Sequence, residues 1–406
     1  MEKLNKKGVL FVINELRPGG AEMFLLRMAK YLSKEYAIFI HCLFPESNDE
    51  EFVSLFKDTL KFEFIFEPKG LSKNKEFLYW KINALFDLFG KKGVYTDLKK
   101  REHRKDLERQ IKESNIKIIN TSAISSDYKS ISYFKKYFKI PVILTMHSDY
   151  NKEFWDIEGR NRDDFFKLSS TILNTADYIF YTADHNIEIV KQINLNHNNI
   201  SKCYLGYEVE DAINIRKELE IEDDAFVVLM MARGIKEKGW IQALEAFVKL
   251  NQINPRSYFL MIHTDSEFMD QLKNEYRNDN IKFLGYVKNP KNHIYSSDCT
   301  MLPSHFPESL PYTITESLAY GKPVLTTAIA EIPQMLKANE EMAGEIIAFD
   351  HQGHCDSDLL SKKLIQYSTD LNILNLKKSY AKIAFQKFSM NSCGETYKEV
   401  INKIIN

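Results

Sequence analysis

The sequence predicts two α/β domains, each built on a parallel, doubly wound sheet. Buried apolar runs of strand length alternate with helical stretches in both halves of the chain. The alternation stops at a polar stretch, residues 207–224, and then restarts. With 406 residues, the chain is long enough for two cores of ordinary size. We therefore place an N-terminal domain at 1–208, a C-terminal domain at 209–385 and a last helix with one apolar face at 386–406.

The first half supplies six predicted strands and the intervening helices. A helix at 21–33 places Phe24, Leu25, Met28 and Leu32 on one face, and a second helix is expected at 50–60. The strands are expected at 8–13, 37–44, 62–66, 117–120, 142–146 and 178–181. The second half repeats the pattern, with an amphipathic helix at 240–251. Its strands are expected at 225–232, 258–263, 281–284, 299–302, 324–327 and 345–349.

Composition excludes several classes of protein. A net charge of −1 argues against a nucleic-acid binder, which is normally basic. The longest apolar runs are far too short to span a bilayer, and no hydrophobic signal core follows the first residues. Five scattered cysteines without a CxxC pair predict reduced thiols in a cytoplasmic protein, with neither a disulfide framework nor a zinc site. No Walker or HExxH motif is present, and we expect neither metal nor cofactor.

Two glutamates, Glu308 and Glu316, are the most informative residues. Seven residues separate them, and a predicted strand precedes the first, while a helix that starts near Pro311 carries the second. Carboxylates accept strong hydrogen bonds from vicinal hydroxyls, so this pair suits the sugar and the ribose of a nucleotide-sugar. The helix start adds backbone N–H groups that suit a diphosphate. The alternative is a capped helix with two solvated acids.

A turn with two cations follows the first strand of the second half. Arg233 and Lys238 flank it, and Gly239 permits close approach of a ligand. A departing nucleoside diphosphate needs its developing charge neutralised, and an arginine–lysine pair does this without a metal. The alternative is a pair of solvated cations.

Two further candidate site features lie in the first half of the chain, and each follows a predicted strand. Gly19 and Gly20 join the first strand to the first helix, where backbone could reach a ligand; a plain Gly-Gly turn is the alternative. His147 ends a strand and is expected to project toward the cleft between the domains. A histidine that only satisfies local hydrogen bonds is the alternative.

The segment 77–109 stands apart from the α/β pattern. An aromatic-rich helix candidate at 77–89 precedes a stretch rich in lysine and arginine. This combination suits a peripheral contact with the inner face of a membrane. A core-packing helix followed by a solvated one explains the segment equally, because Glu102, Asp106 and Glu108 dilute its charge.

Together these motifs resemble those of a family 4 retaining glycosyltransferase (glycosyl transferases group 1) of the GT-B fold, over nearly the whole chain. The most specific is E-x7-E with its trailing A-x-G-x-P-V, from Glu308 to Val324. The further matches are R-x4-K-G at 233–239, G-G-A-E at 19–22, His147, A-D at 176–177 and a V-x-F-x-G-x-V-like run at 281–287. The last helix, 386–406, resembles the one that packs back on the first domain in this family.

The resemblance implies roles for individual residues. Arg233 and Lys238 would hold the donor diphosphate, Glu308 the hydroxyls of the donor sugar, and Glu316 the ribose. Further donor contacts would come from Ser309, Leu310 and Val287. In the first domain, Gly19 and Gly20 would approach phosphate or acceptor, and His147 would lie near the reacting sugar.

Two stretches depart from the family pattern. The loop after the second strand of the nucleotide domain reads I-H-T-D-S at 262–266, where relatives usually carry glycines in a G-x-G pattern, so the resemblance does not define the nucleotide contacts there. An N-G-V-D near the domain boundary is reduced to L-G-Y-E at 205–208.

The sequence thus predicts GT-B: two Rossmann-like domains facing across a cleft. The expected activity is metal-independent, retaining transfer of a hexosyl-type sugar from a nucleotide-sugar, expected to be UDP-linked, to a glycan or lipid-linked acceptor. By family likeness, the setting would be synthesis of bacterial cell-surface polysaccharide. Two alternatives stay open: a nucleotide-sugar epimerase of the same fold, and a non-catalytic subunit of a synthase.

Overall fold

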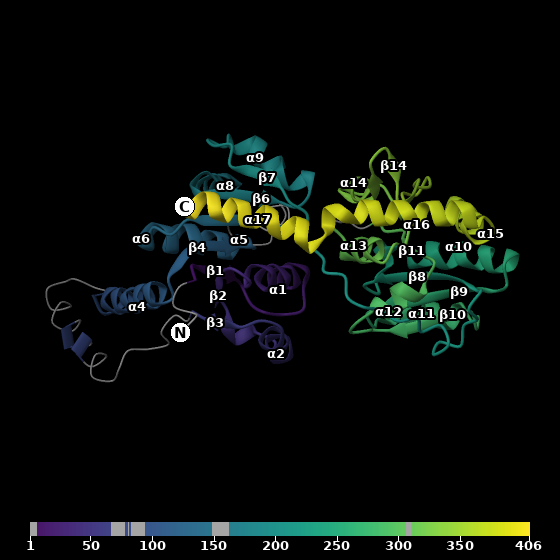
Figure 1. Cartoon of the computed structure of the whole chain (residues 1–406), viewed down its shortest axis with the longest axis horizontal. Helices are drawn as coiled ribbons and strands as arrows, with labels where there is room; N and C mark the ends of the chain where they lie inside the picture. Colours follow the sequence, from purple (N-terminus) through teal and green to yellow (C-terminus); the bar gives the residue numbers. More distant parts are fainter. Residues whose placement is uncertain (1–5, 66–77, 80, 83–93, 148–161, 306–309) are drawn as a thin grey trace. The chain divides into compact units, whose positions relative to one another are not determined.

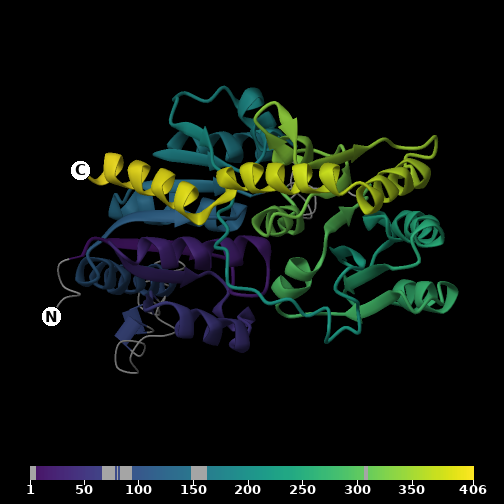
Figure 2. The ribbon, with the colours of Figure 1, turned by 45° about the vertical axis from the view of Figure 1, so that its right-hand side comes forward.

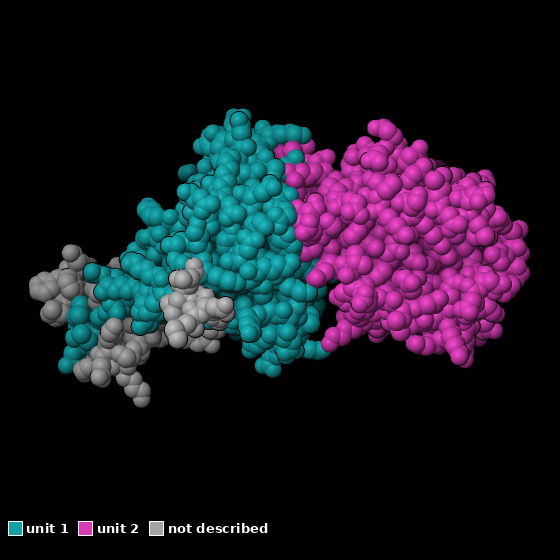
Figure 3. All heavy atoms as spheres, in the orientation of Figure 1, with its two compact units in different colours: residues 1–181, 189–201, 394–406 teal, residues 182–188, 202–393 magenta. Residues whose placement is uncertain are grey.

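The protein is described from a computed structural model. The structure describes residues 6–65, 78–79, 81–82, 94–147, 162–305 and 310–406. The chain divides into two compact units, coloured separately in Figure 3. Unit 1 comprises Met1–Tyr181, Ile189–Ser201 and Gly394–Asn406, and unit 2 comprises Thr182–Glu188 and Lys202–Cys393.

Unit 1 is built on a seven-stranded sheet with the order β3-β2-β1-β4-β5-β6-β7 (Figure 1). Strands β1 to β6 pair in parallel register, as in β5 against β6. The strands are β1 (Gly8–Ile13), β2 (Ala37–Cys42), β3 (Phe62–Phe64), β4 (Ile116–Thr121), β5 (Val142–Met146), β6 (Tyr178–Tyr181) and β7 (Ile200–Lys202). The helices are α1 (Gly20–Leu32), η2 (Pro45–Ser47), α2 (Glu50–Thr59), α4 (Val94–Glu113), α5 (Ile124–Lys129), η3 (Ser130–Lys135), α6 (Lys136–Phe138), α8 (Arg162–Thr175) and α9 (Glu188–Ile193).

The core of unit 1 explains why its strands are continuous apolar runs. All six residues of β1 are buried, because helices cover both faces of a parallel sheet. The last helix, α17 (Met390–Ile405), completes this core. The ring of Tyr397 stacks on Phe180 with 4.1 Å between centroids, and its hydroxyl lies 2.8 Å from Thr145 Oγ1. Residues 394–406 therefore belong to unit 1.

Unit 2 is built on a six-stranded sheet with the order β10-β9-β8-β11-β12-β15, again in parallel register. The strands are β8 (Phe226–Ala232), β9 (Ser257–His263), β10 (Ile281–Gly285), β11 (Cys299–Leu302), β12 (Val324–Thr327) and β15 (Gly344–Ile347), with a small hairpin of β13 (Lys337–Ala338) and β14 (Glu341–Met342). The helices are η4 (Asp184–Ile187), η5 (Lys236–Lys238), α10 (Trp240–Ile253), α11 (Glu267–Glu275), α12 (Lys291–Ser296), α13 (Tyr312–Ala319), α14 (Ile332–Leu336), α15 (Ser357–Thr369), α16 (Leu371–Phe385) and η6 (Gln386–Phe388).

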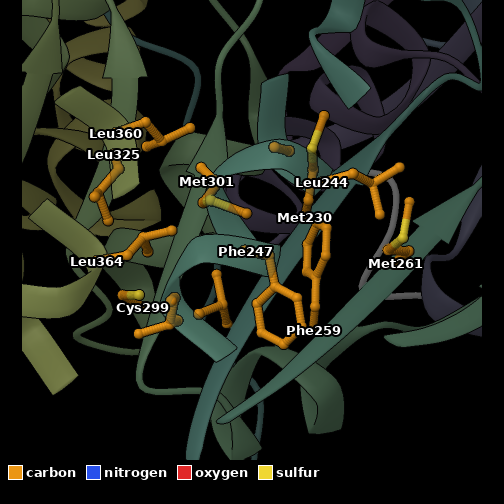
Figure 4. Packing of buried hydrophobic residues seen from close by; sticks show 14 of the residues in the cluster. Met230, Leu244, Phe247, Phe259, Met261, Cys299, Met301, Leu325, Leu360 and Leu364 are labelled. Carbon is orange, nitrogen blue, oxygen red and sulfur yellow. The ribbon is translucent and has the colours of Figure 1, made fainter. Parts of the chain in front are cut away.

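The main core of unit 2 lies between the sheet and the helices α10 and α15. Figure 4 shows Phe247 of α10 beside Phe259 of β9, with 5.4 Å between the two ring centroids. Met301 of β11 and Leu360 of α15 belong to the same buried cluster. Full burial of such side chains stabilises the fold by roughly 1.5–3 kcal/mol each.

A buried carboxylate determines which chain segments belong to unit 2. Glu331, only 2% exposed, accepts hydrogen bonds from the Asp184 N–H (2.9 Å) and the Tyr204 hydroxyl (2.7 Å), and pairs with the Lys202 ammonium. Residues 182–188 and 202–208 thus join unit 2, although we expect them in the first domain from the sequence. From β7 the chain continues as an extended segment toward β8 (Figure 2).

The predicted fold class is confirmed. Strands β1, β5, β6, β11 and β12 have the predicted bounds, and the other predicted strands differ from the observed ones by one or two residues at one or both ends. Strand β7 was missed, because three residues at a sheet edge carry no apolar run. The aromatic candidate at 77–89 and the acid Glu308 lie largely or wholly outside the described residues.

Candidate functional site: the carboxyl edge of the unit 2 sheet

The parallel sheet of unit 2 brings most of the predicted donor residues to one edge. Arg233 directly follows β8, Val287 follows β10, and Leu310 lies between β11 and α13. Parallel strands share their carboxyl edge, where α/β folds bind ligands. Hydrogen bonds tie three loops at this edge together, and we call them the edge loops: residues 233–239, 264–266 and 303–305.

The first edge loop holds the two predicted cations. Arg233 is exposed, whereas Lys238, in the short helix η5, is only 7% exposed. The Trp240 indole N–H donates to the Arg233 carbonyl over 2.8 Å, which fixes the backbone at the cation. Gly239 has φ +80, and a Cβ there would lie 2.0 Å from the Pro303 carbonyl oxygen. Only glycine fits this position, and Lys238 is thereby held in a rigid turn.

The second edge loop is bonded to the first at Gly234. The Gly234 N–H donates to Thr264 Oγ1 over 2.9 Å, and the Ser266 hydroxyl donates to the Gly234 carbonyl over 2.6 Å. A Cβ on Gly234 would lie 2.3 Å from the Thr264 carbonyl oxygen. These two hydrogen bonds hold the loops after β8 and β9 together.

The third edge loop starts the stretch that carries the glutamate signature. The Glu237 carbonyl accepts both the Ser304 hydroxyl (3.2 Å) and the His305 N–H (2.9 Å). The Thr327 hydroxyl donates to the Ser304 carbonyl, which links β12 to the same loop. Burial and the neighbouring His354 ring lower the pKa of His305. Glu308 and Ser309 come next in the chain and lie outside the described residues.

Helix α13 carries the second glutamate of the signature. Pro311 occupies its N-cap, and the helix runs from Tyr312 to Ala319, so the predicted helix start is confirmed. Glu316 is partly exposed, on the helix turn after Thr313, whose hydroxyl donates to the Met231 carbonyl at the end of β8 (3.1 Å). Leu310 is partly buried and packs beside Ile314. Through Thr313, α13 is fixed to the strand that ends at Arg233.

In unit 1, the predicted glycines lie between β1 and α1. Gly19 is the N-cap residue in extended conformation (φ −163), and Gly20 starts the helix. A Cβ on Gly19 would lie 2.2 Å from Glu22 Oε2, so the Glu22 carboxylate covers this backbone. Burial raises the pKa of Glu22. Gly19 is therefore packed against Glu22, and the approach of Gly19 and Gly20 to phosphate or acceptor stays a prediction.

His147 follows β5 in unit 1. Its ring lies edge-on to Phe24, with 5.2 Å between centroids. Burial lowers the pKa of His147 to about 4, so the imidazole is neutral at pH 7. It can act as a hydrogen-bonding group but not as a cation.

The sequence did not single out Trp240, Thr264, Ser266 or His263 as site residues. Their role depends on contacts between separated positions, 7 residues apart for Trp240 with Arg233 and 30 for Thr264 with Gly234, which no local pattern reveals. The signal that could have drawn attention to His263 is its position at the end of a buried strand, within the stretch that departs from the family pattern.

The described residues contain neither a candidate metal site nor a membrane-spanning helix. No group of three or more His, Cys, Asp or Glu side chains in this part of the chain could hold a metal ion. None of its helices has the length and hydropathy of a membrane span.

The comparisons with known proteins agree with this arrangement. The model of the family described as "Glycosyl transferases group 1" matches residues 211–382. The chain is 24% identical, over 98% of its length and 99% of the relative, to the GalNAc-alpha-(1->4)-GalNAc-alpha-(1->3)-diNAcBac-PP-undecaprenol alpha-1,4-N-acetyl-D-galactosaminyltransferase of Campylobacter jejuni. It is 25% identical, over 65% of its length and 71% of the relative, to the alpha-monoglucosyldiacylglycerol synthase of Acholeplasma laidlawii.

A solved structure shows the same fold. The crystal structure of Anabaena Alr3699/HepE in complex with UDP and glucose has a TM-score of 0.70 and 16% identity, covering 98% of this chain and 100% of that one. The matched region and these neighbours agree with the two parallel α/β domains. Residues 211–382 match the glycosyl transferases group 1 model, and the chain has the GT-B fold.

Proposed function

We propose that this glycosyltransferase moves a hexosyl-type sugar from a UDP-linked donor to a glycan or lipid-linked acceptor, with retention and without a metal. We place the reaction on the cytoplasmic side of a bacterial membrane, in the synthesis of surface polysaccharide. The observation that carries the proposal is Lys238, a lysine held at 7% exposure in a turn locked at the carboxyl edge of the unit 2 sheet.

A buried lysine in a rigid turn keeps its charge at one fixed place, and this suits anion binding. The Arg233 backbone, five residues away, is fixed by Trp240, so two cations start from positions that are held before a ligand arrives. Preorganised charge of this kind stabilises a leaving group because little reorganisation is needed when its charge develops.

The proposed chemistry is a front-face transfer. The acceptor oxygen forms a bond to the anomeric carbon while the bond from that carbon to the diphosphate oxygen breaks. The leaving diphosphate takes the proton of the acceptor hydroxyl, and Arg233 and Lys238 neutralise the remaining charge. Glu308 and Glu316 bind hydroxyls of the sugar and the ribose. His147, a neutral imidazole, offers a hydrogen bond near the reacting sugar.

The choice of substrates is supported by the names of similar proteins. HepE was crystallised with UDP and glucose. The Campylobacter relative is named for an undecaprenol-diphosphate-linked glycan, and the Acholeplasma relative for a diacylglycerol lipid. A UDP-sugar and a lipid-linked acceptor are therefore the substrates that we propose for this chain.

We also propose a peripheral membrane contact through residues 77–109. Helix α4 holds seven basic and five acidic residues. Ion pairs within it join Lys105 to Glu102 (3.4 Å) and Lys112 to Glu108 (2.7 Å), as expected for a solvated helix. The remaining excess of positive charge favours binding to an anionic lipid surface. Each basic residue near such a surface contributes about 1 kcal/mol to the binding free energy.

The test compares two lysines of the same short helix. Lys238 is buried and Lys236 is exposed, so Lys236→Ala is the matched control for Lys238→Ala. The full-length protein is incubated with UDP-glucose, UDP-galactose and their N-acetylamino analogues, together with a diacylglycerol or an undecaprenyl-diphosphate-linked saccharide. Products are identified by mass spectrometry. We expect Lys238→Ala to lower kcat/KM by about 100-fold or more, and Lys236→Ala to stay within a few-fold of the wild type.

Other outcomes would contradict the proposal in distinct ways. Equal losses of kcat/KM in the two lysine variants would contradict the role that we propose for Lys238. A donor that is epimerised or hydrolysed at the same rate without any acceptor would favour an epimerase or hydrolase. If no UDP-sugar binds, the chain is not a UDP-sugar transferase.

A further inference from the structure

We propose that His263 recognises the nucleoside half of the donor, through a hydrogen bond that its Nε2 atom accepts. The inference rests on the proposed function and extends it to a residue of the nucleotide site. His263 is the last residue of β9 and lies beside Ala232 in the register of β8 and β9. It therefore occupies the same carboxyl edge as Arg233, one strand away.

The tautomer of His263 follows from its one local hydrogen bond. Nδ1 lies 3.2 Å from the Thr264 carbonyl oxygen, which can only accept. Nδ1 must therefore carry the hydrogen. In the neutral ring, Nε2 then holds a lone pair and is an acceptor.

That acceptor has no partner in the described part of the chain. His263 is 8% exposed, and its Nε2 atom is buried without a hydrogen bond to any described residue. Two aromatic rings lie edge-on to the imidazole, Trp240 at 6.0 Å and Phe283 at 6.1 Å between centroids. A buried polar atom left without a hydrogen bond is costly and rare, and such atoms recur at functional sites.

The chemistry of Nε2 limits which part of a donor it can bind. Phosphate oxygens are acceptors, so a neutral Nε2 does not bind the diphosphate. A ribose hydroxyl or an N–H group of the base supplies the hydrogen that Nε2 needs. Because Nε2 is covered by protein atoms, a neighbouring side chain must move aside when the nucleoside binds.

The order of the strands agrees with a nucleoside contact. Strand β9 lies between β8, which leads to Arg233, and β10, which leads to Val287. The loops on both sides are close: Thr264 bonds to Gly234, and a Cβ on Gly285 would lie 3.7 Å from Asp265 Oδ1. A donor whose diphosphate lies at Arg233 and that extends along the edge toward β10 places its nucleoside over the end of β9.

Residues 262–266 read I-H-T-D-S, so the end of β9 and the loop after it carry side chains and no glycine. A glycine offers only backbone, whereas His263 adds a polar ring at the same edge. The residue would therefore help to select the nucleoside that this enzyme accepts.

The test uses His263→Phe, which keeps an aromatic ring against Trp240 and Phe283 and removes both nitrogens. UDP binding is measured by isothermal titration calorimetry, and thermal unfolding is measured without ligand. We expect the Kd for UDP to rise roughly 2- to 12-fold, the value of one neutral hydrogen bond. We expect the Tm without ligand to change little, because loss of the Nδ1–Thr264 hydrogen bond is offset by removal of the unpaired buried Nε2 atom. A purely structural histidine gives the opposite pair of results, a lower Tm with an unchanged Kd, and would overturn the inference.

Ligand analogues then separate the possible hydrogen donors. The loss of affinity in His263→Phe should persist with UMP and be absent with inorganic pyrophosphate. It should vanish with the analogue that lacks the contacted group: 2′-deoxy-UDP or 3′-deoxy-UDP for a ribose contact, and N3-methyl-UDP for a base contact. A penalty that persists with all three analogues, or that also appears with pyrophosphate, overturns the inference. His263→Gln, whose amide oxygen can accept a hydrogen bond, should recover part of the lost affinity.

The inference and the proposed function fail in different ways. If the wild type binds UDP and transfers sugar while His263→Phe binds UDP equally well, only the His263 assignment is removed. If the wild type binds no UDP, the proposed donor is wrong and the assignment falls with it.

Discussion

Two glycines of unit 2 allow the packing of the edge loops to be measured apart from backbone strain. Gly239 and Gly353 have nearly the same φ, +80 and +81. A Cβ on Gly353 meets no atom within 4 Å, whereas a Cβ on Gly239 lies 2.0 Å from the Pro303 carbonyl oxygen. Alanine at either position is strained by its left-handed backbone, and only at Gly239 does it also collide with another loop.

The expected magnitudes follow from these two terms. Left-handed backbone costs alanine roughly 1–2 kcal/mol at both positions. The collision at Gly239 adds about 1–3 kcal/mol, the usual range for overpacking. The Gly239 carbonyl also accepts the Ala243 N–H over 2.9 Å at the start of α10, so any displacement disturbs that helix. We expect Gly239→Ala to destabilise unit 2 by about 1–3 kcal/mol more than Gly353→Ala.

The assay is thermal unfolding of both variants, paired with UDP binding. For a domain of about 200 residues, 1 kcal/mol shifts the Tm by roughly 2–4 °C, so the two variants should differ by several degrees. Gly239→Ala should also weaken UDP binding, because Lys238 precedes the displaced residue, and Gly353→Ala should bind UDP like the wild type. Equal Tm losses in the two variants, or normal UDP binding by Gly239→Ala, would refute the idea that this turn fixes the cation.

Two further predictions concern unit 1. The folded pKa of His147, about 4, is below its ordinary value of 6.5, so the unfolded chain binds more protons between these values. The contribution of the neutral His147 ring to the free energy of unfolding is complete above pH 6.5 and decreases as the pH falls toward 4. Urea unfolding at pH 7.5 and pH 5 should show a loss of about 2 kcal/mol that His147→Gln lacks; identical pH dependence in both proteins would contradict the burial of this ring. For α4, reversing Lys100 and Arg101 to glutamate should lower sedimentation with phosphatidylglycerol-rich vesicles and leave phosphatidylcholine vesicles unaffected, whereas equal binding to both vesicle types would favour a merely solvated helix.

The sequence predicted those features that depend on local patterns. Strands such as β11 and β12 are buried runs of four residues between polar loops, so periodicity alone located them. The position of Arg233 at a strand end followed from the same pattern. Glu316 was placed inside a helix because Pro311 marks the start of that helix.

Other features depend on contacts between distant residues, and no local pattern contains them. Glu331 holds Asp184, 147 positions earlier in the chain, and this contact assigns the segment 182–188 to unit 2. The importance of His263 becomes visible only when the surroundings of Nε2 are known. The roles of Glu308 and Ser309 stay predictions, since these residues lie outside the described part of the chain.

The Glu331 contacts affect how the two halves of this chain can be separated experimentally. A C-terminal fragment cut in the polar stretch after residue 208 would lose Asp184, Lys202 and Tyr204 together. The remaining carboxylate would then be buried without these three partners, at a cost of several kcal/mol. A C-terminal half that is to be expressed alone should therefore begin before Lys202, and residues 182–188 need to be supplied as a graft or a separate peptide.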